Sequence, residues 1–345
     1  MAQVLLPCVL LTPWSFEMSV VWSRRSFLGA LGVGISVATA STRALASTWP
    51  SKPIKLVVTF PPGGSSDIVA RMLAPQLAAL LGQPVVIENK PGAGSSIGAQ
   101  VVAQSPADGY TLLVSNSAAL SIAPHLLQPA PYHPISSFTH LSYIGAVPTV
   151  VVVHPSVPVQ NFAELLDWIR AQQHPVAFGS GGAASVGHLL GEQLAQNLGL
   201  SMLHVPYRGA GPMRTDLLAG QILVAIDALP QNIPLIQEGK LKAVAVSSAQ
   251  RTGLAPEVPS IAELGYPALA SDNFVGISAP AGLPAEVATR LSAAIRQACR
   301  HPAIVQSLQQ QGFGLADMDA ERFTQMVQHQ YQSWGPIARS TGATL

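Results

Sequence analysis

Short apolar runs of strand length alternate along the chain with stretches in which apolar residues recur at helical spacing. The strand-like runs are 54–60, 85–88, 111–115, 150–154, 176–178, 202–205, 222–226 and 243–246. Helical spacing is seen for Val69, Leu73, Leu77 and Leu80, and again for Phe162, Leu165, Leu166 and Ile169. Strands that alternate with helices predict an α/β fold with largely parallel sheets.

The first 46 residues have the pattern of an export signal. Arg24 and Arg25 precede an uncharged stretch over 26–42, and the small residues Ala44 and Ala46 form a signal-peptidase pattern. A membrane anchor is the alternative, but the stretch is short and no cysteine follows it for lipid attachment. We therefore expect a twin-arginine signal that is cleaved after Ala46, and a mature protein in the periplasm. Met1 and Met18 are both candidate starts.

The composition of the mature chain is obtained by leaving out the residues of the predicted signal. The whole chain is 48% hydrophobic and only 10% charged, and part of the apolar excess belongs to the signal. Without residues 1–46 the chain keeps 15 Lys and Arg against 16 Asp and Glu, so no nucleic-acid partner is expected. Cys299 is then the one cysteine left, which excludes an internal disulfide and a thiolate metal cluster. Cys299 lies in a stretch with helical spacing, so its small apolar side chain is expected to be buried.

The length of the mature chain predicts two lobes, because domains beyond about 250 residues tend to split. We expect lobe 1 to comprise 47–148 and 275–345, and lobe 2 to comprise 149–274. The helical stretches 285–299 and 320–338 would return to lobe 1. The chain would cross between the lobes near 147–150 and 272–276, where small rotations would close a cleft.

Two glycine turns with matching sequences follow predicted strands. FPPGGSSD at 60–67 and FGSGGAAS at 178–185 each place a Gly-Gly pair after a strand, with a polar side chain where a helix begins. The two turns fall in different predicted lobes. Sites in α/β sheets form beyond the carboxyl ends of strands, so two such turns facing each other predict one pocket with two walls.

The turn at Gly63 and Gly64 predicts an anion site that needs no cation. The glycines can adopt backbone angles that aim successive N–H groups into one concavity, and the helix start adds unpaired donors with roughly half a positive charge. Hydrogen bonds to a charged group contribute roughly 1.5–3 kcal/mol each. Three or four approach the roughly 8 kcal/mol of micromolar binding. Ordinary capping by Ser66 and Asp67 is the alternative for a single turn.

Other chemistries are poorly supported by the motifs. The glycines at 92–98 suggest dinucleotide binding, but the third glycine comes one residue late and Pro91 interrupts the turn, so no cofactor is expected. The histidines include no H-E-x-x-H pair, so no metal is expected. Neither Ser180 nor Ser185 lies in G-x-S-x-G, and His188 is expected to pack or cap. A serine hydrolase that uses Ser180 is a minor alternative.

Many ordered motifs resemble the Bug-type substrate-binding proteins of tripartite tricarboxylate transporters. They include WPSKPIKLVVTFPPGGSSDIVARMLA, ENKPGAGSSIGAQVVA, FGSGGAASVGHLLGE and HVPYRGAGPMRTDLLAGQI, and the similarity runs from Trp49 to the C-terminus. The resemblance implies a periplasmic-binding-protein-like (Venus flytrap) fold of two α/β lobes, each with a central sheet flanked by helices. It implies a monomeric receptor, not an enzyme.

The resemblance also implies the ligand and its partner. Such a receptor closes on a small organic carboxylate, which can be a di- or tricarboxylate, an aromatic acid or an amino acid. It delivers the ligand to a membrane permease of the tripartite tricarboxylate type. A sensing receptor without a dedicated permease is the alternative.

The residues implied to line the cleft follow from matching the motifs position by position. They are Phe60, Gly64, Ser66 and Asp67 in the first wall, Ser115 and Asn116 after the third strand, Ser180 and Ser185 in the opposing wall, and Tyr207 and Asp227 between them. Two positions depart from the family pattern. Arg208 stands where lysine is common and Phe274 where tryptophan is common, so both bear on the identity of the ligand.

Three of these positions keep a second interpretation. Asp67 can complement the helix dipole instead of touching the ligand. Tyr207 and Arg208 can brace the loop that enters the predicted helix 211–219. Asp227 can cap a helix or bind a donor group of the ligand.

Overall fold

The computed structural model describes residues 49–342 and 345, and the predicted signal at 1–46 lies outside them. Trp49–Leu345 forms one compact unit built on a mixed sheet. Its strands are β1 Ile54–Val58, β2 Val85–Asn89, β3 Thr111–Asn116, β4 Phe138–Val153, β5 Val176–Ser180, β6 Met202–Pro206, β7 Val224–Ala228, β8 Lys242–Val246, β9 Asp272–Pro280 and β10 Gly314–Leu315.

The sheet has the order β2-β1-β3-β9-β4-β7-β5-β6, with β8 and β10 also paired to β4. The outer strands are parallel, as expected: β1 pairs with β2 and β3, and β5 pairs with β6 and β7. The middle strands differ from the expectation, because β9 and β4 run antiparallel to their neighbours. The sheet is therefore parallel only away from its centre.

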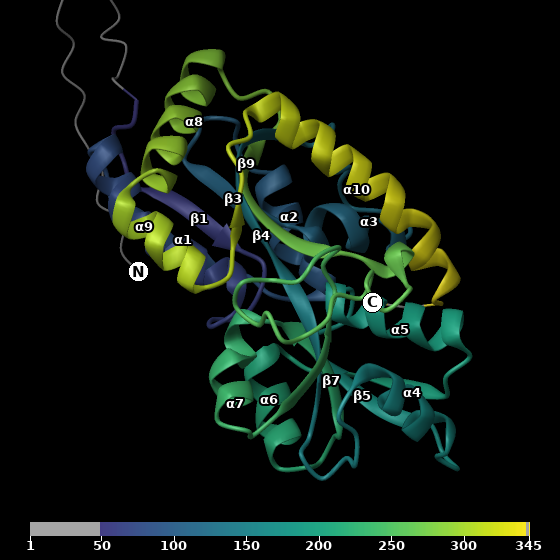
Figure 1. Cartoon of the computed structure of the whole chain (residues 1–345). Helices are drawn as coiled ribbons and strands as arrows, with labels where there is room; N and C mark the ends of the chain where they lie inside the picture. The colour runs from purple at the N-terminus through teal and green to yellow at the C-terminus, as the bar shows by residue number, and fades with distance from the viewer. Residues whose placement is uncertain (1–48, 343–344) are drawn as a thin grey trace, which may run out of the picture. The chain divides into compact units, whose positions relative to one another are not determined.

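β4 belongs to both halves of the sheet (Figure 1). Its residues from Phe138 to Pro148 pair with β9, whereas those from Thr149 onward pair with β7 and β8. The change falls between Pro148 and Thr149. Only the part from Val150 was predicted as a strand, because the earlier part interleaves apolar residues with His140, Ser142 and Gly145.

Helices cover both faces of each half of the sheet (Figure 1). They are α1 Ser65–Leu81, α2 Ser96–Ala103, α3 Ala123–Leu126, α4 Phe162–Arg170, α5 Val186–Leu198, α6 Ala210–Leu218, α7 Ile233–Gln237, α8 Ala285–Cys299, α9 Pro302–Gln310 and α10 Ala320–Ser340, with short turns η1 Ala93–Ser95, η2 Ala118–Ile122, η3 Pro230–Asn232 and η4 Pro267–Leu269. α1, α8 and α9 lie on one side of the first half, and α2, α3 and α10 on the other, while α4 to α7 surround the second half.

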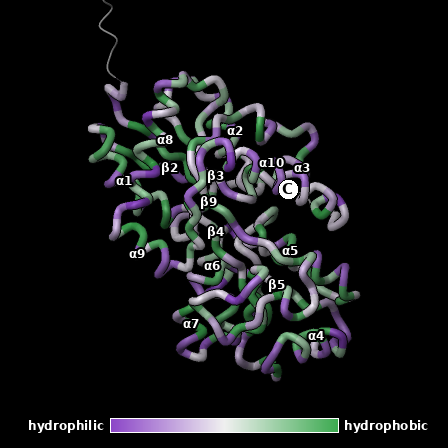
Figure 2. The backbone as a smooth tube through the Cα atoms, turned by 45° about the horizontal axis from the view of Figure 1, so that its top comes forward, coloured by the Kyte–Doolittle hydropathy of each residue, from purple (hydrophilic) through white to green (hydrophobic). Residues whose placement is uncertain are grey.

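Each half has its own apolar interior. Leu56, Leu73 and Ile277 belong to the cluster beneath α1 and α8, and Phe178 belongs to the one beneath α4 and α5. Burial of this kind stabilises by about 25 cal/mol per Å² of apolar surface. Hydrophobic and hydrophilic segments alternate along the chain in Figure 2. No helix within the described part is both long enough and apolar enough to cross a membrane.

Cys299 differs slightly from the expectation. It is free and only half-buried at the end of α8, where it packs beside the first interior cluster. Burial raises the pKa of its thiol to about 12. The side chain is therefore a neutral packing residue at ordinary pH.

A buried hydroxyl joins the strands where the two halves meet. Ser247 Oγ accepts the N–H of Thr149 at 2.9 Å and lies 2.8 Å from Thr149 Oγ1. The same hydroxyl donates to the carbonyl of Ser271 at 2.5 Å. One side chain of the second half thus links the points at which the chain leaves and re-enters the first half.

Candidate functional site

A cavity of about 120 Å³ lies between the two glycine turns that the sequence singled out. Six of the residues expected at the site line it, namely Phe60, Gly63, Gly64, Ser66, Ser185 and Asp227. They come from the β1–α1 turn, the start of α5 and the end of β7. The carboxyl ends of β1, β5 and β7 thus meet at one hollow, as expected for an α/β sheet.

Three helices begin at this cavity. Ser65 of α1, Val186 of α5 and Ala210 of α6 each line it, and the residues that cap them are Gly64, Ser185 and Gly209. The first turn of a helix carries N–H groups without intrahelical acceptors and roughly half a positive charge. Three such ends give the cavity a positive potential. The start of α6 was not predicted as part of the site.

In the first turn, the two glycines behave differently. Gly63 has a φ of +90°, which other residues rarely adopt, but Gly64 has a φ of −86°, which any residue can adopt. This corrects the expectation that both positions need glycine conformations. The Gly63 N–H donates to Asp67 Oδ2 at 2.9 Å, so it is already engaged. The Ser65 and Ser66 N–H groups precede the first helical bond, which runs from Ile68 to Gly64.

Asp67 lies behind this turn and does not line the cavity. The residue is 2% exposed, and its side chain accepts hydrogen bonds from Arg71 Nε and Asn89 Nδ2, each at 2.9 Å, besides that from Gly63. Burial alone would raise its pKa, but these bonds outweigh burial and lower it. Asp67 is therefore an ionised brace for the turn.

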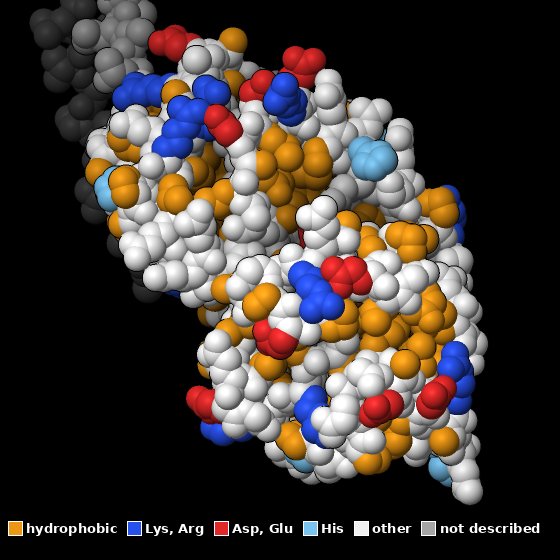
Figure 3. Space-filling view, viewed as in Figure 1, with side chains coloured by type: hydrophobic (Ala, Val, Ile, Leu, Met, Phe, Trp, Pro, Cys, Tyr) orange, Lys and Arg blue, Asp and Glu red, His pale blue; other side chains and the backbone are white. Residues whose placement is uncertain are grey.

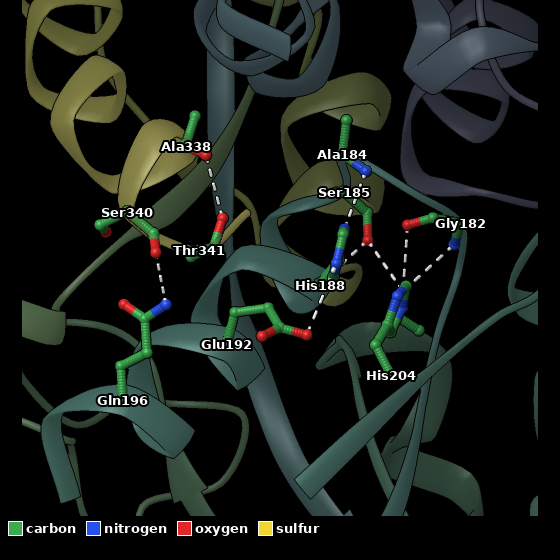
Figure 4. Close-up of polar contacts among 11 residues, drawn as sticks. Gly182, Ala184, Ser185, His188, Glu192, Gln196, His204, Ala338, Ser340 and Thr341 are labelled. Carbon is green, nitrogen blue, oxygen red and sulfur yellow. Dashed lines mark hydrogen bonds and ion pairs between the residues drawn. The ribbon is translucent and has the colours of Figure 1, made fainter. Parts of the chain in front are cut away.

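The second turn is held by a cluster of hydroxyl and imidazole groups (Figure 4). Ser185 Oγ accepts the His188 N–H at 3.1 Å and donates to Ser180 Oγ at 3.2 Å. Ser180 Oγ lies 2.7 Å from His204 Nε2 and 3.0 Å from the Gly182 carbonyl oxygen. Ser185 reaches the cavity, whereas Ser180 is fully buried behind it.

The imidazole rings of His188 and His204 are stacked on each other within this cluster. The His188 and His204 ring centroids are 3.7 Å apart, with 12° between the ring planes. Burial lowers the pKa of His188 to about 4 and that of His204 to about 3, so both rings are neutral near pH 7. Nδ1 of His188 accepts the Ala184 N–H at 3.1 Å, and Nε2 lies 3.8 Å from Glu192 Oε1. His188 thus packs, as expected.

The third wall contains a cation that the sequence analysis missed. Arg214 of α6 lines the cavity, and its Nη1 lies 3.2 Å from Asp227 Oδ2. Asn232 Nδ2 donates to the same carboxylate oxygen at 3.0 Å. Burial raises the pKa of Asp227, while Arg214 acts in the opposite direction. In the sequence, the feature that could have indicated this cation is the position of Arg214 in the first turn of the predicted helix after the Tyr-Arg-Gly motif.

A side chain from the second half of the sheet also contacts the first half across the cavity. Gln231 of η3 donates from Nε2 to Ser65 Oγ at 3.2 Å. Its Oε1 is buried, and no hydrogen-bond partner for it is found among the described residues.

The remaining predicted residues lie elsewhere. Ser115, Asn116 and Phe274 are buried outside the cavity: Ser115 Oγ accepts from Ser278 Oγ at 3.1 Å, and Asn116 Nδ2 donates to Thr59 Oγ1 at 2.8 Å. Tyr207 and Arg208 line a second cavity beside the first. The Tyr207 hydroxyl donates to Asp216 Oδ2 at 2.9 Å, which helps to brace the loop before α6.

The family model for the "Tripartite tricarboxylate transporter family receptor" matches residues 69–343. The chain belongs to this family. It is 35% identical over 319 residues to protein BugT of Bordetella pertussis, which covers 92% of this chain and 98% of BugT. Members are periplasmic solute-binding proteins and not enzymes, so the resemblance drawn from the motifs is confirmed.

Solved structures agree with this assignment. The periplasmic binding protein BugD superposes with a TM-score of 0.80 at 30% identity, over 86% of this chain and 99% of BugD. An R. palustris protein solved with adipate superposes with a TM-score of 0.81 at 30% identity, over 86% of this chain and all of its own. The two-lobed α/β fold expected from the motifs is therefore confirmed. The contact between Ser180 and His204 therefore occurs in a solute-binding protein and not in an enzyme.

Proposed function

We propose that this receptor binds a small organic carboxylate in the cavity between its two glycine turns, for uptake by a tripartite tricarboxylate-type permease. The convergence of three helix N-termini on that cavity carries the proposal. Helix N-termini favour anions without needing a lysine or arginine of their own. The relative solved with adipate supports an acid as the ligand.

The charges around the cavity fit an acid of low net charge. Arg214 is largely compensated by Asp227, so backbone donors supply most of the positive potential. Two or three charge-assisted hydrogen bonds from first-turn N–H groups would contribute roughly 1.5–3 kcal/mol each. On the face seen in Figure 3, Lys and Arg side chains gather at the upper left and are elsewhere interspersed with Asp and Glu.

The change in strand pairing supports the proposed lobes and their closure. We place lobe 1 at 47–148 and 275–345 and lobe 2 at 149–274, with rotation near 147–150 and 272–276. In these stretches β4 exchanges partners and β9 begins. Ligand would favour the closed state because only that state lets both turns contact it.

Calorimetry on the mature protein tests the proposal. Thermal-shift screening against dicarboxylates, tricarboxylates, aromatic acids and amino acids would first find a ligand. Gly64→Val would then weaken its binding by about tenfold or more, because the side chain would enter an open space of the cavity at a permissive φ.

Gly253→Val is the matched control, since Gly253 is exposed, lines neither cavity and has open space where an added Cβ would lie. Unchanged affinity in Gly64→Val, or binding of no acid at all, would refute the proposed site.

Export is a separate part of the proposal. The arginine pair at Arg24 and Arg25 supports delivery by the twin-arginine route with cleavage after Ala46. The double substitution Arg24→Lys, Arg25→Lys should leave precursor in the cytoplasm, as seen by cell fractionation. Normal periplasmic delivery of that variant would contradict the route but not the ligand site.

A further inference from the structure

A separate cavity of about 300 Å³ lies between α5, α10 and the segment 268–272, which leads into β9. We call it the α5–α10 cavity. Its walls include Gln193 of α5, Trp334 of α10 and Asp272 at the start of β9. It shares no lining residue with the cavity between the glycine turns or with the second cavity beside that one. A ligand bound here would therefore leave the proposed carboxylate site free.

The α5–α10 cavity lies where the two halves of the sheet meet. α5 packs on β6 and β7 of the second half, whereas α10 packs on β4 and η2. The two helices also contact each other directly, since Gln196 Nε2 of α5 donates to the Ser340 carbonyl of α10 at 2.6 Å (Figure 4). A ligand in this cavity would thus contact elements of both halves.

The carboxylate of Asp272 has no partner in this cavity wall. Its Oδ1 is enclosed, its Oδ2 is not, and no hydrogen bond or ion pair reaches either oxygen from the described residues. Burial raises the pKa of this carboxyl group, and no neighbouring group lowers it. A carboxylate that loses part of its hydration normally gains a paired cation or hydrogen-bond donors, because an unpaired charge is costly to bury. Asp272 therefore lacks a cationic partner that a ligand could supply.

The buried carboxylates elsewhere in the described chain show what is missing. Asp67 pairs with Arg71 at 2.9 Å. Asp227 pairs with Arg214 at 3.2 Å. In both cases an arginine of the same fold compensates the charge. Asp272 is the carboxylate that instead lies beside a cavity wide enough for a small molecule.

The other walls of the α5–α10 cavity suit a cation with a short carbon chain. No Lys or Arg of the described residues lines it, so nothing there repels a positive charge. Gln193 brings an amide oxygen, and Ser333 Oγ, which donates to the His329 carbonyl at 2.9 Å, keeps lone pairs for a further donor. Trp334 and Ile337 add an apolar wall. An ammonium group with three N–H donors matches such a set of acceptors.

A metal ion fits this cavity less well. The described residues contain no group of three or more His, Cys, Asp or Glu side chains that could hold one. Divalent cations take several oxygen or nitrogen ligands, which one carboxylate does not provide. The chemistry of the walls thus favours an organic cation.

We propose that the α5–α10 cavity binds a small organic ammonium ion, with its charged nitrogen at Asp272. This inference goes beyond the proposed function, because the site and its ligand are distinct from the carboxylate and its cavity. The receptor would then bind an acid and an amine at the same time, at two different places.

Thermal-shift assays and calorimetry on the mature protein test this site. The probes are ethanolamine, choline and putrescine, with potassium chloride at equal ionic strength as the inorganic reference. At least one amine should bind and raise the unfolding midpoint, whereas potassium chloride should not. Asp272→Asn should weaken that binding by about tenfold or more, because it removes a charge-assisted hydrogen bond. It should also raise the midpoint of the ligand-free protein, because it removes an unpaired charge.

Two further variants make the result interpretable. Glu257→Gln removes a carboxylate from an exposed position outside the α5–α10 cavity and should leave amine binding as in the wild type. Ser333→Phe fills the cavity from α10 without changing the carboxylate and should block the amine. It covers the case in which Asp272→Asn folds poorly.

The site is refuted if no amine binds, if potassium chloride acts as strongly as the amines, or if Asp272→Asn and Ser333→Phe bind the amine as tightly as the wild type does. Competition between the amine and a saturating acid ligand would place the amine in the carboxylate cavity and refute it too. Each of these outcomes leaves the proposed carboxylate site standing.

Discussion

Ser180 Oγ lies 2.7 Å from Nε2 of His204, on the neighbouring strand β6. The pair has the composition of a serine–histidine dyad, but the serine is fully buried and its hydroxyl also donates to the Gly182 carbonyl. A nucleophile must be reachable by its substrate. The contact therefore serves to fix the second glycine turn.

Ser180→Ala should lower the free energy of unfolding by about 1–3 kcal/mol, because it leaves buried polar groups of the turn unpaired. It should produce no change in hydrolysis of a chromogenic ester, which the wild type should not turn over. Ser156→Ala is the control, since Ser156 Oγ lies 2.7 Å from His154 Nδ1 at an exposed site. Serine-dependent ester turnover would overturn this structural role.

The stacked histidines predict that the protein loses stability in mild acid. Their folded-state pKa values of about 4 and about 3 lie below the ordinary value near 6.5, so the unfolded chain binds protons first as the pH falls. Stability from these groups is present above pH 6.5 and declines toward pH 4. The slope is up to about 1.4 kcal/mol per pH unit for each histidine.

Urea unfolding between pH 7.5 and 4.5 measures this slope. His188→Gln should flatten it, whereas substitution of the exposed His174 by Gln should leave it as in the wild type. Among the described residues, the carboxylate beside the pair is that of Glu192, whose Oε1 lies 3.8 Å from His188 Nε2. An unchanged slope in His188→Gln would contradict the explanation.

Asp67→Asn should destabilise the fold by about 1–3 kcal/mol, because the ion pair to Arg71 and the hydrogen bond from Gly63 are both weakened behind the first turn. The loss should be largest above pH 4, where the wild-type carboxylate is ionised. Asp167→Asn breaks an exposed ion pair with Arg170 and should change stability by less than about 0.5 kcal/mol. Equal effects of the two substitutions would refute the bracing role.

The Arg214–Asp227 pair distinguishes backbone binding from side-chain binding of the acid. Replacing both residues, by Arg214→Gln with Asp227→Asn, removes the pair without leaving a buried charge. Affinity for the acid found by screening should then change by less than about tenfold if backbone donors carry the binding. A loss of a hundredfold or more would show that Arg214 holds the ligand.

The apolar pattern predicted the elements well wherever burial is continuous. The runs before both glycine turns correspond to β1 and β5, and the predicted helix 285–299 matches α8. The first part of β4 escaped prediction because its buried positions include His140 and Ser142, which are satisfied by hydrogen bonds to Ser278, Pro134 and Tyr143. The spacing of apolar residues alone does not show which polar residues can be buried because distant segments supply their hydrogen bonds.

Only part of the site was predicted, because the rest depends on contacts between segments that are distant in the sequence. The two glycine turns were visible because their sequences repeat, and both line the cavity. Arg214 and the start of α6 were missed because α6 carries no such repeat. Contacts between distant segments decide these roles, and local sequence does not report them.

The position of β9 in the chain has a consequence for how the first half of the sheet is made. The sheet of the first half is completed by β9, which follows the whole second half in the sequence. A ribosome must therefore synthesise the chain as far as β9 before β3 can pair with its native neighbour on that side. Expressing residues 49–148 without β9 should therefore yield an insoluble product, and split-reporter designs should cut the chain at an outer loop instead.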